Sequence, residues 1–83
     1  MSRSLRRREQ RWLISQVREV VGDNTELYLD HKAGVLTVRT DRETARTLRN
    51  RTFHYDYNEA YFQLEPLEEW NPSEREYAFR VSV

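Results

Sequence analysis

Apolar residues recur at three- and four-residue spacing over residues 4–21, and this pattern predicts an amphipathic helix. Its apolar stripe consists of Leu13, Val17 and Val20, joined by Ile14 and Val21. Gly22 follows the last periodic residue, where a glycine readily adopts the positive φ that ends a helix. Because the arginines of the first turns oppose the helix dipole, we expect residues 1–9 to form a basic, frayed segment and the firm helix to begin near Gln10.

A β-hairpin is predicted over residues 25–40, where apolar and polar residues alternate on both sides of a turn. We expect residues 31–34 to form the loop, with Gly34 in the left-handed conformation. The cross-strand pairs are then Leu29 with Leu36, Leu27 with Val38, Asp30 with Val35, Tyr28 with Thr37 and Glu26 with Arg39. The first two pairs share one face in this register, and a shift of one residue would separate them.

A second helix is predicted over residues 41–49, because Thr40 and Glu43 form the Thr-x-x-Glu pattern of a capping box. Its core-facing residues are Ala45 and Leu48. Three arginines at positions i, i+4 and i+7 line the opposite side of this helix. They are Arg42, Arg46 and Arg49.

Residues 52–65 are predicted to form a second hairpin that turns on Asn58 and Glu59. The expected pairs are Tyr57 with Ala60, Tyr55 with Phe62 and Phe53 with Leu64. Every large apolar residue of this hairpin then faces one side. Pro66 stops the strand, and residues 67–75 predict a loop or a single helical turn.

The alternation over residues 77–83 predicts a last strand. The chain is therefore expected to form a single α+β domain over residues 1–83, in the order α-β-β-α-β-β-β. An antiparallel sheet with both helices packed on one face would bury the apolar faces derived above. If the last strand lies at a sheet edge, its unpaired N–H and C=O groups favour a homodimer. An interior position would remove this possibility.

Composition narrows the class of protein. A chain of 83 residues with 37% hydrophobic and 34% charged residues is expected to fold as one domain. The chain contains no cysteine, so it has no disulfides, thiolate nucleophiles or cysteine-based zinc sites. No apolar run approaches the length of about 18 residues that predicts a membrane span. We therefore expect a cytoplasmic protein.

Charge is distributed unevenly, although the formal net charge is +0. Six arginines against two glutamates give residues 1–21 a net charge of +4. Residues 55–83 carry seven acidic residues against two arginines, a net charge of −5. Thirteen of the fourteen basic residues are arginine, the side chain that binds phosphate and carboxylate through two parallel hydrogen bonds. This polarity favours charged partners.

Nucleic acid is the first partner that this pattern favours, because arginine forks contact phosphates irrespective of base sequence. The candidate contacts in the first helix and in the second are Arg6, Arg7, Arg8, Arg11, Arg42, Arg46 and Arg49. Tyr28 and Tyr61 fall on the non-core sides of their strands, where their rings could stack on unpaired bases. The alternative is that the charged helix faces are simply solvated.

A protein partner is the second hypothesis. The acidic part of the chain places glutamates around a tryptophan, and this combination could dock on a basic surface. The candidate residues are Glu65, Glu68, Glu69 and Trp70. In size and composition such a chain resembles small inhibitors from phages or mobile elements, such as anti-CRISPR proteins. The alternative is that Trp70 folds back as a cover over the sheet edge.

An enzyme is the least favoured hypothesis. His54 and Asp56 lie two residues apart on the non-core side of a strand, and His31 lies in a turn. Either histidine could serve a metal-free ribonuclease, but polar residues on the wet face of a hairpin are the favoured explanation of the spacing. The chain contains no nucleophile elbow, P-loop or zinc-protease motif. We therefore expect a non-enzymatic binding module with no metal and no cofactor.

Overall fold

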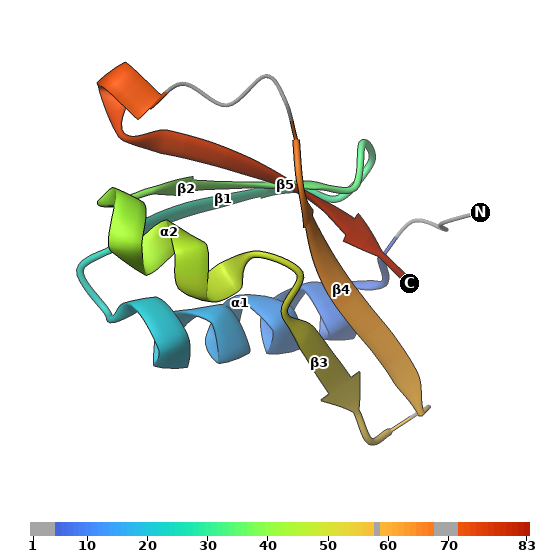
Figure 1. Cartoon of the computed structure of the whole chain (residues 1–83). Helices are drawn as coiled ribbons and strands as arrows, with labels where there is room; N and C mark the ends of the chain where they lie inside the picture. The colour runs from blue at the N-terminus through green and yellow to red at the C-terminus, as the bar shows by residue number, and fades with distance from the viewer. Residues whose placement is uncertain (1–4, 58, 68–71) are drawn as a thin grey trace.

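The structure is a computed structural model that describes residues 5–57, 59–67 and 72–83. Its elements follow the predicted order α-β-β-α-β-β-β (Figure 1). The helices are α1 (Arg7–Val21) and α2 (Arg42–Leu48), and a short 3-10 turn, η1, spans Pro72–Glu74. The strands are β1 (Glu26–Asp30), β2 (Val35–Arg39), β3 (Thr52–Tyr55), β4 (Ala60–Pro66) and β5 (Glu76–Ser82).

The five strands form one curled antiparallel sheet in the order β1-β2-β5-β4-β3, with both helices on one face (Figure 1). The last strand of the chain, β5, is therefore the central strand. It pairs with β2 from Val35↔Arg80 to Arg39↔Glu76, and with β4 from Gln63↔Ser82 to Pro66↔Phe79. The expected edge position of this strand is wrong, which removes the basis for a homodimer through its unpaired backbone groups.

The first hairpin has the predicted register, in which Leu29 pairs with Leu36 and Leu27 pairs with Val38. Gly34 ends the loop with a φ of 70°, a left-handed conformation that glycine adopts without a steric penalty. Asp30 closes the loop, because its side-chain Oδ1 accepts hydrogen bonds from two loop amides, each at 3.1 Å. The turn and the apolar pattern therefore specify the same alignment.

The second hairpin differs from its prediction by two residues. Tyr55 pairs with Ala60 and Phe53 pairs with Phe62, so the turn contains four residues, 56–59, instead of two. Glu59 adopts a φ of 55°, which lets the chain re-enter β4. A shift of two residues keeps every side chain on its predicted face. The core is consequently as expected, but Tyr57 lies in the turn.

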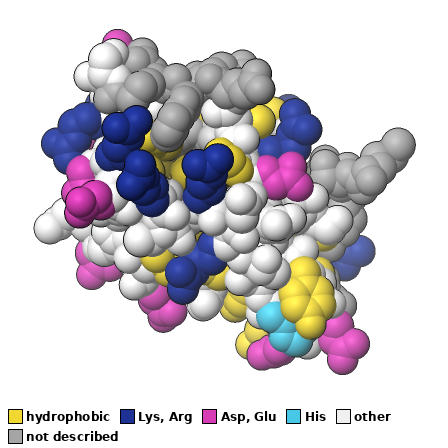
Figure 2. Space-filling view, in the orientation of Figure 1, with side chains coloured by type: hydrophobic (Ala, Val, Ile, Leu, Met, Phe, Trp, Pro, Cys, Tyr) yellow, Lys and Arg dark blue, Asp and Glu magenta, His cyan; other side chains and the backbone are white. Residues whose placement is uncertain are grey.

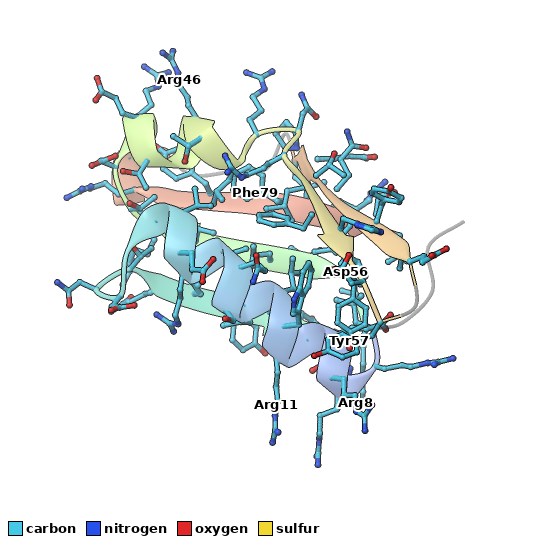
Figure 3. All side chains as sticks on the ribbon, turned by 90° about the horizontal axis from the view of Figure 1, so that it is seen from below. Arg8, Arg11, Arg46, Asp56, Tyr57 and Phe79 are labelled. Atoms are coloured by element: carbon cyan, nitrogen blue, oxygen red, sulfur yellow. The ribbon has the colours of Figure 1, made fainter. Side chains whose placement is uncertain are left out.

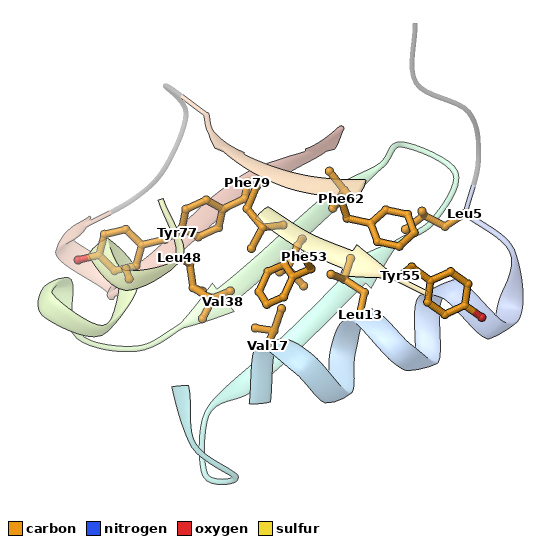
Figure 4. Packing of buried hydrophobic residues seen from close by; sticks show 14 residues of the cluster. Leu5, Leu13, Val17, Val38, Leu48, Phe53, Tyr55, Phe62, Tyr77 and Phe79 are labelled. Atoms are coloured by element: carbon orange, nitrogen blue, oxygen red, sulfur yellow. The ribbon is translucent and has the colours of Figure 1, made fainter. Parts of the chain in front are cut away.

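The core lies between the sheet and α1, with α2 covering the end of the sheet (Figure 4). Phe62, Leu13, Leu36, Leu48, Leu64, Val17, Val38 and Val81 are its fully buried apolar residues. Helix α1 begins at Arg7, three residues before the predicted Gln10, and Leu5 ahead of it is buried. Glu9 supports this start, because its buried carboxylate accepts a hydrogen bond from the Arg6 amide at 2.8 Å.

The cap of α2 also differs from its prediction by one residue. Asp41, and not Thr40, is the N-cap, and its Oδ1 accepts a hydrogen bond from the Thr44 amide at 2.7 Å. The backbone amide of Thr40 instead donates to the carbonyl of Arg75 and so continues the sheet. Hydrogen bonding by Thr44 holds the pKa of Asp41 below its ordinary value of 3.8.

Candidate nucleic-acid interface

The structure separates the predicted arginines into two groups on opposite sides of the molecule. Arg8 and Arg11 project from α1 on one side, and Arg46 projects from α2 on the other (Figure 3). Arg6 is the N-cap of α1 and Arg7 is its first residue, and both are exposed. The candidate arginines therefore do not form one continuous surface.

The two predicted stacking tyrosines lie on the open face of the sheet, as expected, with Tyr28 68% exposed and Tyr61 59% exposed. They belong to β1 and β4, which are separated by β2 and β5. Three strand spacings correspond to about 14 Å. Tyr61 also stacks on His54, with ring centroids 4.6 Å apart and planes at 20°. The two tyrosines therefore do not form a common stacking platform.

A groove on the helix side combines arginines with aromatic rings. We call it the aromatic groove, and it has a volume of about 450 Å³. Its lining residues are Arg8, Arg11, Trp12 and Ser15 of α1, Tyr55 of β3, and Tyr57 of the turn. The ring centroids of Trp12 and Tyr55 lie 5.0 Å apart, and those of Tyr55 and Tyr57 lie 5.2 Å apart. Three rings are therefore in contact beside two guanidinium groups.

The local fold explains why these residues meet. The four α1 residues fall at positions i, i+3, i+4 and i+7, so they share one face of the helix. Tyr55 is the last residue of β3, and the turn begins directly after it. Tyr57 thus leaves the ladder and is 82% exposed. Figure 3 shows Tyr57 on the same side of the molecule as Arg8 and Arg11.

Trp12 anchors the groove to the core. Its ring makes edge contacts with Phe53 at a centroid distance of 6.5 Å and a tilted contact with Phe62 at 5.9 Å. Trp12 is half-buried, and Tyr55 below it is buried. The exposed ring of Tyr57 therefore rests on a packed aromatic cluster that holds its supporting ring, Tyr55, in place.

Two of the acidic groups near this end of the molecule, Glu9 and Asp56, have partners. Glu9 is buried and accepts the hydrogen bond from the Arg6 amide. Asp56, beside Tyr57 at the tip of the hairpin (Figure 3), lies with its Oδ1 3.0 Å from Nδ1 of His54. Arg8 and Arg11 are exposed and can therefore meet an anionic ligand.

His54 and Asp56 are in contact, as their spacing in the sequence allowed. The contact uses Nδ1 of His54 and does not involve the other ring nitrogen, Nε2. Both side chains are exposed to solvent. Among the described residues, no group of three or more histidine and carboxylate side chains could hold a metal ion. Asn58, which continues this row in the sequence, lies outside the described residues, and His31 is exposed in the β1–β2 loop.

Of the predicted acidic protein-binding residues, only Glu65 belongs to the described part of the chain. It is half-buried on β4, and its partner in the register is Arg80 of β5. Residues Glu68, Glu69 and Trp70 lie outside the described residues. The described structure thus places Glu65 opposite Arg80 in a cross-strand pair of opposite charge.

Sequence reasoning missed the aromatic half of the groove: Trp12, Tyr55 and Tyr57. One signal was present, because Trp12 falls four residues after Arg8, a spacing that places the two side chains side by side on one face of a helix. The position of Tyr57 depended on the turn length, which the apolar pattern does not determine. The groove therefore depends on how α1 packs against β3 and on the length of the turn after β3.

In the described part of the chain, neither helix combines the length and the apolar character that crossing a membrane requires. The comparisons with known proteins give no family: no family model, no curated protein and no solved structure matches this chain.

Proposed function

We propose that this protein is a small non-enzymatic module that binds single-stranded nucleic acid in the aromatic groove. The observation that carries the proposal is the contact between the rings of Trp12, Tyr55 and Tyr57 beside Arg8 and Arg11. Proteins that bind single strands combine aromatic stacking surfaces with positive charge along the backbone path. Both components are present in the aromatic groove.

The two kinds of side chain have separate roles in this mechanism. The exposed ring of Tyr57 offers a face on which an unpaired base stacks, and Tyr55 supports that ring from below. Arg8 and Arg11 lie three residues apart on α1, about 4.5 Å along the helix axis. Their long side chains can therefore contact neighbouring phosphates of one strand.

A single strand fits this groove better than a duplex. Bases in a duplex are already stacked and paired, so the ring of Tyr57 would have no free base face to contact. The groove volume of about 450 Å³ also falls in the range of sites that enclose small ligands or single groups of larger ones. Stacking on a ring face tolerates any base, so we expect weak sequence preference.

Charge reversal at the groove should weaken binding of a fluorescent single-stranded oligonucleotide, measured by fluorescence anisotropy. We expect the double variant Arg8→Glu with Arg11→Glu to lose about tenfold or more in affinity, because two charge-assisted contacts become repulsive. Wild-type affinity should fall with salt, and these two arginines should contribute about −1.4 to the logarithmic slope.

The matched control is Arg42→Glu with Arg46→Glu, which makes the same change in net charge on the opposite side of the molecule. We expect this variant to bind within about twofold of wild type once long-range electrostatics are screened near physiological salt. Equal losses in both double variants would mean that binding follows net charge and not the groove. No detectable wild-type binding at low salt would refute the proposal.

A further inference from the structure

A second groove lies on the side of the molecule opposite Arg8 and Arg11, where α2 meets the last residue of β4 and the middle of β5. We call it the arginine groove, and it has a volume of about 470 Å³. Its rim carries Arg42, Arg46 and Arg49, and its apolar lining includes Ala45, Leu67 and Phe79. Figure 2 shows Lys and Arg side chains around apolar ones over this part of the surface.

The rim arginines form a regular row. Arg42 and Arg46 lie four residues apart on one side of α2, and Arg49 is the C-cap directly after its last residue. All three are exposed. Within the described part of the chain, no carboxylate lies at ion-pair distance from any of the three. These exposed guanidinium groups can therefore meet an external anion.

The floor of the arginine groove has a different chemistry from the aromatic groove. Ala45 is buried on α2, and its small side chain contributes little bulk to the wall of the groove. Leu67 is half-buried, and Phe79 is only 3% exposed, so the Phe79 ring offers no free face to a base. The accessible apolar surface of the groove comes from exposed Pro66 and from half-buried Leu67 and Ala78, which can receive an apolar side chain. Because the groove exposes no aromatic ring face, a nucleobase has nothing to stack on there.

We propose that the arginine groove docks an acidic protein segment in which a large apolar side chain stands between carboxylates. The apolar side chain would fill the floor, and the flanking carboxylates would pair with the rim arginines through two parallel hydrogen bonds each. Charge complementarity selects this partner, because the rim carries three positive charges and the floor carries none.

The two grooves lie on opposite sides, as the positions of Arg46 and of Arg8 with Arg11 show (Figure 3). A protein segment in one therefore leaves the other free. This surface goes beyond the proposed nucleic-acid function and does not depend on it. Together the two sites would let one small domain hold a protein partner beside a single strand.

The test uses three short fluorescent peptides and the full chain. The first alternates glutamates with leucines, the second replaces each leucine by serine, and the third replaces each glutamate by lysine. We expect the first peptide to bind wild type about tenfold or more tightly than either of the other two peptides. It alone carries both the carboxylates that pair with the rim arginines and the leucines that fill the apolar floor. Leu67→Ser should lower that affinity by removing part of the floor.

Variants assign the binding to this groove. Arg42→Glu with Arg46→Glu should lower the affinity for the first peptide about tenfold or more, and Arg8→Glu with Arg11→Glu should leave it within about twofold. Circular dichroism checks that each variant is folded. Three peptides that bind equally, or equal losses in both double variants, would overturn the proposal. Displacement of the first peptide from wild type by a single-stranded oligonucleotide would assign the arginine groove to nucleic acid instead.

Discussion

Replacing Leu36 by alanine should lower the free energy of unfolding by about 2–5 kcal/mol. Leu36 is 0% exposed on β2, where its register partners are Leu29 of β1 and Phe79 of β5. The truncation opens a cavity in the middle of the sheet face that α1 and α2 cover. A domain of 83 residues is stable by only about 4–12 kcal/mol in total. We therefore expect this variant to be close to unfolding at 37 °C.

Leu29→Ala is the matched control, because it removes the same atoms from the directly opposite position on the edge strand. Leu29 is only half-buried, so less contact area is lost and solvent can relax into the site. We expect a distinctly smaller loss, measured for both variants by urea unfolding. A loss below about 1 kcal/mol for Leu36→Ala would show that β2 does not pack as described.

Val81→Pro should prevent cooperative folding altogether. The backbone amide of Val81 donates a hydrogen bond to the Gly34 carbonyl at 2.7 Å, and its side chain is 1% exposed. Proline removes this donor, and its ring does not fit inside a paired strand. Because β5 lies between β2 and β4, the disturbance reaches both halves of the sheet.

Val81→Ala separates the two effects, because alanine keeps the amide and removes only side-chain volume. We expect the alanine variant to fold with reduced stability and the proline variant to show neither a native circular dichroism spectrum nor an unfolding transition. A proline variant that folds with near-native stability would mean that β5 is not the central strand.

The first hairpin could be derived from the sequence because two independent signals coincide there. Four apolar side chains share a face only in one register, and Gly34 at the end of the loop requires the same register. The second hairpin lacks such agreement. A slip of two residues preserves both faces, so the pattern of Phe53, Tyr55 and Phe62 is equally satisfied by either turn length.

The central position of β5 could not be derived from local pattern. Strand order depends on pairing between segments distant in the chain, and β5 pairs with β2 across more than thirty residues. The strong alternation of apolar and polar residues in β5 is equally compatible with a position at the edge of the sheet. The central position of β5 follows from its apolar face, which carries Tyr77, Phe79 and Val81. Between the apolar strands β2 and β4, this face lies at the centre of the core.

The candidate sites also combine features that local sequence pattern predicts with features that depend on tertiary structure. Helical spacing predicted that Arg42, Arg46 and Arg49 line up, and they line the same groove. The arginines of the first helix were expected in a frayed segment, so the row of Arg8 and Arg11 on α1 was not predicted. Which rows face the same side depends on how the helices pack, and the sequence pattern contains no such information. The aromatic groove needed both helix packing and the four-residue turn that exposes Tyr57.

The most direct measurement for the proposed function compares Tyr57→Ala with Tyr28→Ala in their affinity for a single-stranded oligonucleotide. Both tyrosines are exposed, at 82% and 68%, so neither substitution should unfold the domain. If bases stack in the aromatic groove, Tyr57→Ala loses about 1–3 kcal/mol of binding free energy and Tyr28→Ala retains wild-type affinity. Wild-type affinity in Tyr57→Ala, or a larger loss in Tyr28→Ala, would contradict binding in the aromatic groove.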